Sequence, residues 1–436
     1  MELKECAAFV GIDWGDRCHA IHVIDGRTQK GKSQMLDQDP ESIDQWVAKL
    51  RMLFPDQKIA VCLEQKRGPL INALMKFDNL ILVPVNPSQL ASFRDTFGPA
   101  GAKNDPNDAQ LLAELLHKHS DRLRPWYPDG GWIRKLRVVV EDRRLFVNER
   151  TRLTNRLKST LKQYFPLALE VTGDCIYSYM ACQLLAKYST FEALQAVSDE
   201  ELLQFYRDQG CYYESVNNKR LKAVRKSMPL TTDQAIIESY SLRVRSIVST
   251  IETLNSAIDN YDSQINAIME SHHDEADIFE SFPGAGKVMA PRLLGAFGSD
   301  RDRLSSANEI QQLAGVAPVT KQSGKSKVTH RRWACNKFLL QTFHEFAALS
   351  IKHSIWAEAY YEHATKNQGM KHQAAIRSLA FKWVRILFRC WKNKVSYDEL
   401  KYCDALRKRN SDLLPIITGK ITAKRKESAD QDQQLT

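Results

Sequence analysis

The chain has 436 residues and a mass of 49.9 kDa, with 62 Lys and Arg against 52 Asp and Glu and a net charge of +10. This length suggests about three domains, and a hydrophobic fraction of 43% with a mean hydropathy of −0.41 excludes a disordered or fibrous protein. No run approaches about 18 apolar residues and the nine Cys form no CxxC pair, which excludes a membrane span and favours a reducing, cytoplasmic location.

The first 120 residues alternate predicted strands and helices. The predicted strands are 7–12, 18–24, 29–35, 58–63 and 80–85, and the predicted helices are 41–54, 70–77 and one that starts at Asp105. Asp105 and Pro106 have the residue types of a helix cap and a first helical turn. Alternation after an initial hairpin predicts an α/β layered domain over residues 1–125.

From Trp132 the pattern is helical, and one helix has the clearest periodicity in the chain. Its apolar residues follow one another in alternating steps of three and four, as a heptad seam does: Ile237, Tyr240, Val244, Ile247, Ile251, Leu254, Ile258, Tyr261, Ile265 and Ile268. We predict a helical and coiled-coil region over 126–278, with an insertion of short helices at about 166–230. The seam needs a partner helix, which is either 132–165 of the same chain, another subunit of a dimer or tetramer, or both.

Positive charge is concentrated in two segments. Residues 319–394 contain 15 Lys and Arg against three Glu, and residues 131–165 contain ten against three acids, so the remaining chain is net acidic. Basic segments with interleaved tryptophans are typical of proteins that bind nucleic acid. A solvated helix face is the alternative, and a lipid surface fits less well because no clean apolar face accompanies the charge.

Residues 279–400 predict a mainly helical, basic C-terminal domain. It begins with a Gly-rich turn at 283–287 near helical segments, as in helix-hairpin-helix units that bind phosphate. The polar tail 401–436 is expected to fray from Asn410. Four aromatic residues have helical spacing and are expected in the core: Trp333, Phe338, Trp383 and Trp391.

Four acidic residues have positions that suit a metal site. Asp13 and Glu64 end predicted strands, where carboxylates point into the crevice at the carboxyl edge of an α/β sheet. Asp105 and Asp108 are three residues apart at a helix start and share a helix face. Oxygen ligands suit Mg²⁺, and two such ions about 3.5–4 Å apart promote attack and departure at phosphorus. Taken singly, these acids are more typical of a turn cap, a helix cap and a surface residue.

The motifs GIDWGD, CLEQKRG and KNDPNDA, which contain these acids, resemble the DEDD tetrad of RuvC-like domains. More narrowly, they resemble the insertion-sequence transposases related to the Piv invertases, a family of bridge-RNA-guided serine recombinases. FPGAGKVMAPRLLGAFG and LAGVAPVTKQSGKSKVTHRRW resemble the C-terminal transposase domain of that family, so the resemblance covers residues 7–118 and about 279–395. It implies an α/β plus all-α protein with an RNase H-like (RuvC-like) N-terminal domain, a coiled-coil middle and a helical C-terminal domain.

The resemblance also implies the chemistry. The four acids would hold Mg²⁺ or Mn²⁺, and Ser323, on a flexible loop downstream of Gly315 and Pro318, would attack the DNA backbone, with Ser326 as a supporting residue at most. The residues expected at the nucleic acid are Lys287, Lys321, Gly324, Lys325, Lys327, Arg331, Arg332 and Lys337.

The predicted function is that of a DNA transposase or recombinase. It would cut and rejoin donor and target DNA through a phosphoserine, with a structured guide RNA to choose the target. Two alternatives remain from the residues themselves. One is a RuvC-like metal-dependent nuclease or resolvase without a covalent intermediate, and the other is a non-catalytic scaffold that binds nucleic acid.

Overall fold

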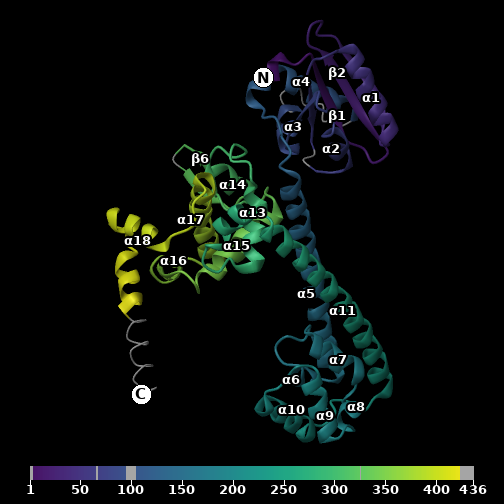
Figure 1. The fold of residues 1–436 in the computed structure, drawn as a ribbon, viewed down its shortest axis with the longest axis vertical. Helices are drawn as coiled ribbons and strands as arrows, with labels where there is room; N and C mark the ends of the chain where they lie inside the picture. The colour runs from purple at the N-terminus through teal and green to yellow at the C-terminus, as the bar shows by residue number, and fades with distance from the viewer. Residues whose placement is uncertain (1–2, 65–66, 95–104, 325, 423–436) are drawn as a thin grey trace. The chain divides into compact units, whose positions relative to one another are not determined.

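The computed structural model of the protein describes residues 3–64, 67–94, 105–324 and 326–422, except for the side chains of Ser88 and Asp105. These residues belong to two compact units, Met1–Pro128 and Asp129–Thr436 (Figure 1). None of the helices within the described ranges has both the length and the hydropathy of a membrane span. The candidate acids lie in the first unit and the candidate serine lies in the second.

A five-stranded mixed sheet forms the centre of the first unit. Its strands are β1 (Ala8–Asp13), β2 (Cys18–Asp25), β3 (Gly31–Asp37), β4 (Ile59–Leu63) and β5 (Leu80–Pro84). Their order is β3-β2-β1-β4-β5, with β1 antiparallel to β2 and parallel to β4. All five predicted strands are confirmed, although β3 begins and ends two residues later than its pattern predicts. The sheet is compatible with an RNase H-like domain.

Helices cover both faces of this sheet. They are α1 (Pro40–Leu53), α2 (Pro69–Leu74), α3 (Pro87–Arg94) and α4 (Asp105–Lys118), with short 3-10 turns at Leu3–Glu5 and Ser120–Arg122. Helices α1 and α2 pack against one face, and α3 and α4 pack against the other (Figure 1). Helix α1 begins at Pro40 because Asp39 caps it, accepting a hydrogen bond from the backbone N–H of Ser42. Helix α3 was not predicted, since it is too short for a clear apolar periodicity.

Helix α4 lies very close to β1 at Gly11. A Cβ atom at Gly11 would be 2.0 Å from the carbonyl oxygen of Ala109, so only glycine lets the helix backbone approach the strand. Phe9 lies two residues earlier in β1, and the centroid of its ring is 4.7 Å from the centroid of the His117 ring in α4. Helix α4 therefore runs antiparallel to β1, and its first turn lies toward the end of the strand at Asp13.

We expect Gly11→Ala to lower the free energy of unfolding by about 3 kcal/mol, because the added methyl group collides with main chain that cannot move aside as a flexible side chain would. Hydrogen exchange is expected to rise in the peptides of β1 and α4. Gly419→Ala is a suitable control, since a Cβ at Gly419 would meet nothing within 4 Å. Equal unfolding midpoints and exchange rates in the two variants would contradict the close contact.

Two long helices pair along their length in the second unit. They are α5 (Gly131–Tyr164) and α11 (Gln234–Glu270) (Figure 1). Arg143 donates hydrogen bonds to Asp262, and Arg150 donates one to Asn255, so the two helices run antiparallel. Apart from the half-buried tyrosines, the seam predicted for α11 is buried. Of the partners predicted for this seam, the structure shows the one in the same chain.

Two apolar clusters contain the remaining helices of this unit. Between α5 and α11, the chain forms α6 (Ala168–Val171), α7 (Tyr179–Lys187), α8 (Phe191–Gln195), α9 (Asp199–Asp208) and α10 (Glu214–Lys226). After α11 it forms α12 (His273–Glu280), α13 (Gly286–Phe297), α14 (Ala307–Leu313), α15 (Lys337–Ser350), α16 (Ile355–Glu362), a π-helical turn at His363–Asn367, α17 (His372–Asn393) and α18 (Glu399–Lys408). A hairpin of β6 (Val319–Ser323) and β7 (Ser326–His330) lies between α14 and α15. The predicted, mainly helical character of the C-terminal part is confirmed.

The end of the described chain differs from its prediction. The sequence predicts a frayed polar tail, whereas residues 414–422 are helical. Leu413 and Ile417 are buried in the apolar cluster of the C-terminal helices, and Lys420 forms an ion pair with Glu358 at 2.7 Å. Two apolar residues at helical spacing are enough to anchor this segment, although its average composition is polar.

Candidate functional site

Asp13 and Glu64 lie at the ends of neighbouring parallel strands. Asp13 is the last residue of β1, and Glu64 directly follows the last residue of β4. Ile12 and Leu63 are paired across these strands, so the two acids lie at the same level on strands about 5 Å apart. Both acids are half-buried. Because side chains alternate along a strand, Asp13 is on the same face as Gly11, which is the face that α4 covers.

Asp108 lies on the first turn of α4 and is 3% exposed. Its Oδ1 atom accepts a hydrogen bond from Nη2 of Arg94 at 2.5 Å. The next residue, Ala109, contacts β1 at Gly11, so the helix places Asp108 on the face of the sheet that also carries Asp13. A buried carboxylate needs a compensating positive charge, and in this structure the guanidinium of Arg94 supplies it.

The chemistry of these acids fits a divalent cation. Carboxylates from β1, β4 and α4 supply the oxygen donors that Mg²⁺ and Mn²⁺ prefer. Asp105 begins the same helical turn as Asp108, and its side chain is outside the described part of the chain. Among the described side chains, no three of Asp, Glu, His and Cys are grouped closely enough to hold an ion, and Asp108 pairs with Arg94. Burial, and next the charge of Glu64, raise the pKa of Cys62, so this neighbouring thiol adds no negative charge.

Ser323 lies at the tip of an exposed β-hairpin. Ser323 and Ser326 are the last pair of the β6–β7 ladder before the turn, which contains Gly324, and Lys325 lies outside the described residues. The sequence predicts a flexible loop here, whereas the structure has two strands that are exposed apart from Val319. A hairpin of only two strands is marginally stable in water. The side chain of Ser323 is thus exposed at the tip of the hairpin.

The base of this hairpin is held by the helical part of the unit. Gly315 has a φ of +70°, and a Cβ at this position would be 2.5 Å from Sγ of Cys335. The backbone N–H of Asn336 donates a hydrogen bond of 2.9 Å to the carbonyl oxygen of Leu313, which joins the segments before and after the hairpin. Val316, directly after Gly315, is buried in the apolar cluster of the C-terminal helices. The exposed tip thus projects from a fixed base.

Most of the predicted nucleic-acid contacts lie on the hairpin or directly after it. Lys321 and Lys327 are exposed on the two strands, Arg331 and Arg332 follow β7 and are half-buried, and Lys337 is exposed at the start of α15. These side chains place positive charge around Ser323 and along the segment that leads away from it.

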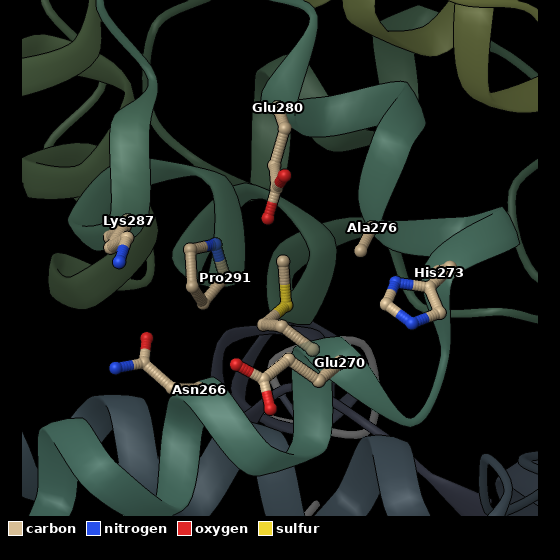
Figure 2. Close-up of a pocket in the computed structure, with 8 residues that line it drawn as sticks. Asn266, Glu270, His273, Ala276, Glu280, Lys287 and Pro291 are labelled. Carbon is tan, nitrogen blue, oxygen red and sulfur yellow. The ribbon is translucent and has the colours of Figure 1, made fainter.

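Lys287 has a different environment. It lies in α13 and lines a cavity of about 200 Å³ that residues of α11 and α12 also line (Figure 2). Glu270 and Glu280 line the same cavity, together with His273. Two carboxylates near this lysine offset its charge, so Lys287 is less suited to a polyanion than the cations of the hairpin.

The aromatic residues that were predicted in the core differ in burial. Trp383 and Trp391 are fully buried, and Phe338 is half-buried. Trp333 is 70% exposed, so the predicted core position was wrong for this residue. The guanidinium carbon of Arg331 lies 4.7 Å from the centroid of its ring. An exposed indole beside a cation is suited to stack on a nucleobase.

Two family models match this chain. Residues 10–166 match a model of the DEDD transposases of IS110, and residues 276–362 match the model of transposases of the IS116/IS110/IS902 family. Together the matches cover more than half of the chain. The first includes the four acids, and the second includes Ser323.

Similarity to individual proteins extends over nearly the whole chain. The chain is 25% identical to a mini-circle putative transposase for IS117 from Streptomyces coelicolor, over 90% of this chain and 95% of that protein. It is 24% identical to a 43.6 kDa protein of insertion element IS110 from the same organism, over 91% of this chain and 97% of that protein. A 42 kDa protein of insertion element IS900 from Mycobacterium paratuberculosis is 24% identical over 89% of this chain and 96% of its own length. The similarity therefore includes both units.

Proposed function

Because the chain belongs to the IS110/IS116 family of DEDD transposases, enzymes that cut and rejoin DNA, we propose that it transfers DNA strands through a phosphoserine at Ser323. The observation that supports this most directly is the position of Ser323, exposed at the tip of a cationic hairpin with a fixed base. A primary hydroxyl in such a position can approach a phosphodiester in line with its leaving group.

We infer that Asp13, Glu64, Asp105 and Asp108 hold Mg²⁺ or Mn²⁺. Support comes from the converging ends of β1 and β4 and from the close contact of α4 with the same face of the sheet. A bound divalent ion supplies positive charge that stabilises the negative charge developing at phosphorus. Asp108 carries a charge that is balanced by Arg94, so the side chain of Arg94 has to release this carboxylate when a cation takes its place.

In the proposed reaction, the Ser323 oxygen forms a bond to phosphorus while the bond from phosphorus to a sugar oxygen breaks. The serine proton passes to a base or to water, and the departing sugar oxygen takes up a proton. A sugar hydroxyl of another strand then attacks the phosphoserine and restores the serine. The number of phosphoester bonds is the same before and after, so rejoining needs no external energy source. Lys321 and Lys327, on the two strands of the hairpin, stabilise the charge on the phosphoryl oxygens.

We propose that a structured RNA chooses the DNA target. The basic segment 319–394 is suited to phosphate contacts, which position a nucleic acid but do not read its sequence. The chain contains no zinc-finger pattern that would read base edges. Base pairing to a bound RNA supplies the missing selectivity.

Because strands of two duplexes are exchanged, more than one serine is needed, and we propose a dimer or tetramer.

A strand-exchange assay with the full chain tests this function. Donor and target are the DNA segments that flank its gene, joined products are amplified across the new junctions, and the RNA that co-purifies with the protein is sequenced. We expect joined products that depend on Mg²⁺, together with one discrete RNA. Cleavage without joining would instead identify a nuclease, and binding without cleavage would identify a scaffold.

A further inference from the structure

An open groove with a volume of about 410 Å³ lies between the base of the β6–β7 hairpin and helices α15 and α17. Its lining includes three cations and three neutral polar side chains: Arg331, Lys337, Arg377, Gln341, His344 and Gln373. None of the described residues that line it is acidic. The groove therefore concentrates positive charge beside the base of the arm that carries Ser323.

Several buried nitrogen atoms of the residues that line this groove have no hydrogen-bond partner within the described part of the chain. They are Nε of Arg331, Nε of Arg377 and Nε2 of His344. Leaving such a polar atom unpaired costs about 1–3 kcal/mol, and more for a charged group. Burial, together with the charges of Arg377 and Arg331, lowers the pKa of His344 to about 4, so the imidazole is neutral at pH 7. An anion bound in the groove would offset the repulsion between the two guanidinium groups, and its oxygen atoms would accept hydrogen bonds from their N–H groups.

We propose that this groove binds a backbone phosphate of the DNA strand that Ser323 attacks. The inference rests on the proposed function for the identity of that strand. Two guanidinium groups suit a phosphate because each presents N–H donors in a planar fork that matches its oxygens. Arg331 directly follows β7, so a phosphate held here lies at the base of the hairpin whose tip carries Ser323.

A strand fits this groove better than a free anion does. Trp333 is 70% exposed, and its indole lies against the guanidinium of Arg331. A base next to the bound phosphate can stack on this indole, which is worth about 1–3 kcal/mol per base. Inorganic phosphate has no group that would use this surface. The groove and the indole together therefore match a nucleotide.

Binding measured without cleavage tests the proposal. The full chain with Ser323→Ala is titrated into a fluorescent single-stranded DNA oligonucleotide without Mg²⁺, at several salt concentrations. We expect Arg377→Ala to raise Kd about tenfold, which corresponds to one lost charge-assisted contact. It is also expected to reduce the slope of log affinity against log salt by about 0.7, the value for one phosphate on a single strand.

Arg389→Ala is the matched control. Arg389 is exposed on the same helix, α17, and does not line the groove, so its removal is expected to change Kd by less than about twofold. Thermal unfolding distinguishes binding from a structural role. Because burial, and next the charge of Arg331, disfavour the charged form of Arg377 in the free protein, Arg377→Ala is expected to keep or raise the melting temperature. Loss of a structural contact would instead lower it.

Equal affinity of the Arg377→Ala and Arg389→Ala proteins for the oligonucleotide would overturn the proposal.

Inorganic phosphate is the second probe. If it alone raised the melting temperature of the parent chain but not of Arg377→Ala, and oligonucleotide binding were unchanged, the groove would be a free-anion site. If the Arg377 effect on binding holds while strand exchange fails in the functional assay, the phosphate site stands and the proposed reaction is wrong.

Discussion

Replacing Ser323 with alanine is expected to abolish a covalent protein–DNA adduct and to reduce strand joining by at least about a thousandfold. In the proposed reaction the serine oxygen holds phosphorus between the two transfers, and alanine has no atom that can replace it. The adduct is measured by stopping the reaction with denaturant and separating labelled DNA that remains attached to protein. Mass spectrometry of the attached peptide then locates the phosphoserine.

Ser326 provides the matched control for this substitution. It is the same residue type, it is also exposed, and it pairs with Ser323 across the hairpin. We expect Ser326→Ala to form the adduct and to join strands. Loss of the adduct in Ser326→Ala but not in Ser323→Ala would identify Ser326, on β7, as the nucleophile instead of Ser323. An adduct-free reaction in the parent chain would favour the metal-dependent nuclease.

Asp108→Asn is the second substitution with a large expected effect. The amide has almost the same shape as the carboxylate but lacks its charge, so we expect DNA binding to persist and cleavage to fall about a thousandfold through lost stabilisation of charge at phosphorus. Cleavage is measured at saturating DNA over a range of Mn²⁺ concentrations. A weaker metal site would shift this dependence to higher concentrations.

Arg94→Gln separates the carboxylate from its ion pair. Both substitutions remove the ion pair between Arg94 and Asp108, but only Asp108→Asn removes the carboxylate. We expect Arg94→Gln to cleave DNA and to need no more Mn²⁺ than the parent chain, because its carboxylate has lost a competing positive charge. If the two variants lost cleavage equally, the ion pair would be a structural feature and Asp108 would not be a metal ligand.

The first unit was largely predictable from sequence because its signals are local. Each strand is a short apolar or alternating run bounded by turn residues, and these runs were located within about two residues. Asp13 and Glu64 were placed at strand ends by the same pattern, and the pairing of Ile12 with Leu63 puts those ends side by side. The close approach of α4 at Gly11 was not predicted, because it depends on a contact between segments far apart in the chain.

The serine region was harder to predict for physical reasons. The two strands of its hairpin are exposed on both faces, so they lack the alternation of apolar and polar residues that identifies a strand. Arg94 and Arg377 were missed because an ion pair and a groove between distant segments leave no local pattern. Trp333 was predicted in the core from helical spacing, but it lies outside any helix, in the segment between β7 and α15, and is exposed. The catalytic roles of the acids and of Ser323 are predictions that the substitutions above test.

The two-stranded hairpin has a further consequence for solubility. A sheet of two strands has an unpaired edge on each side, and such edges tend to add strands from other molecules. Lys321 on β6 and Lys327 on β7 place an exposed ammonium group on each strand, and like charges disfavour stacking of one hairpin on another. The cations that attract a polyanion thus also discourage aggregation of the free protein. Neutralising them would increase self-association even where no nucleic acid is present.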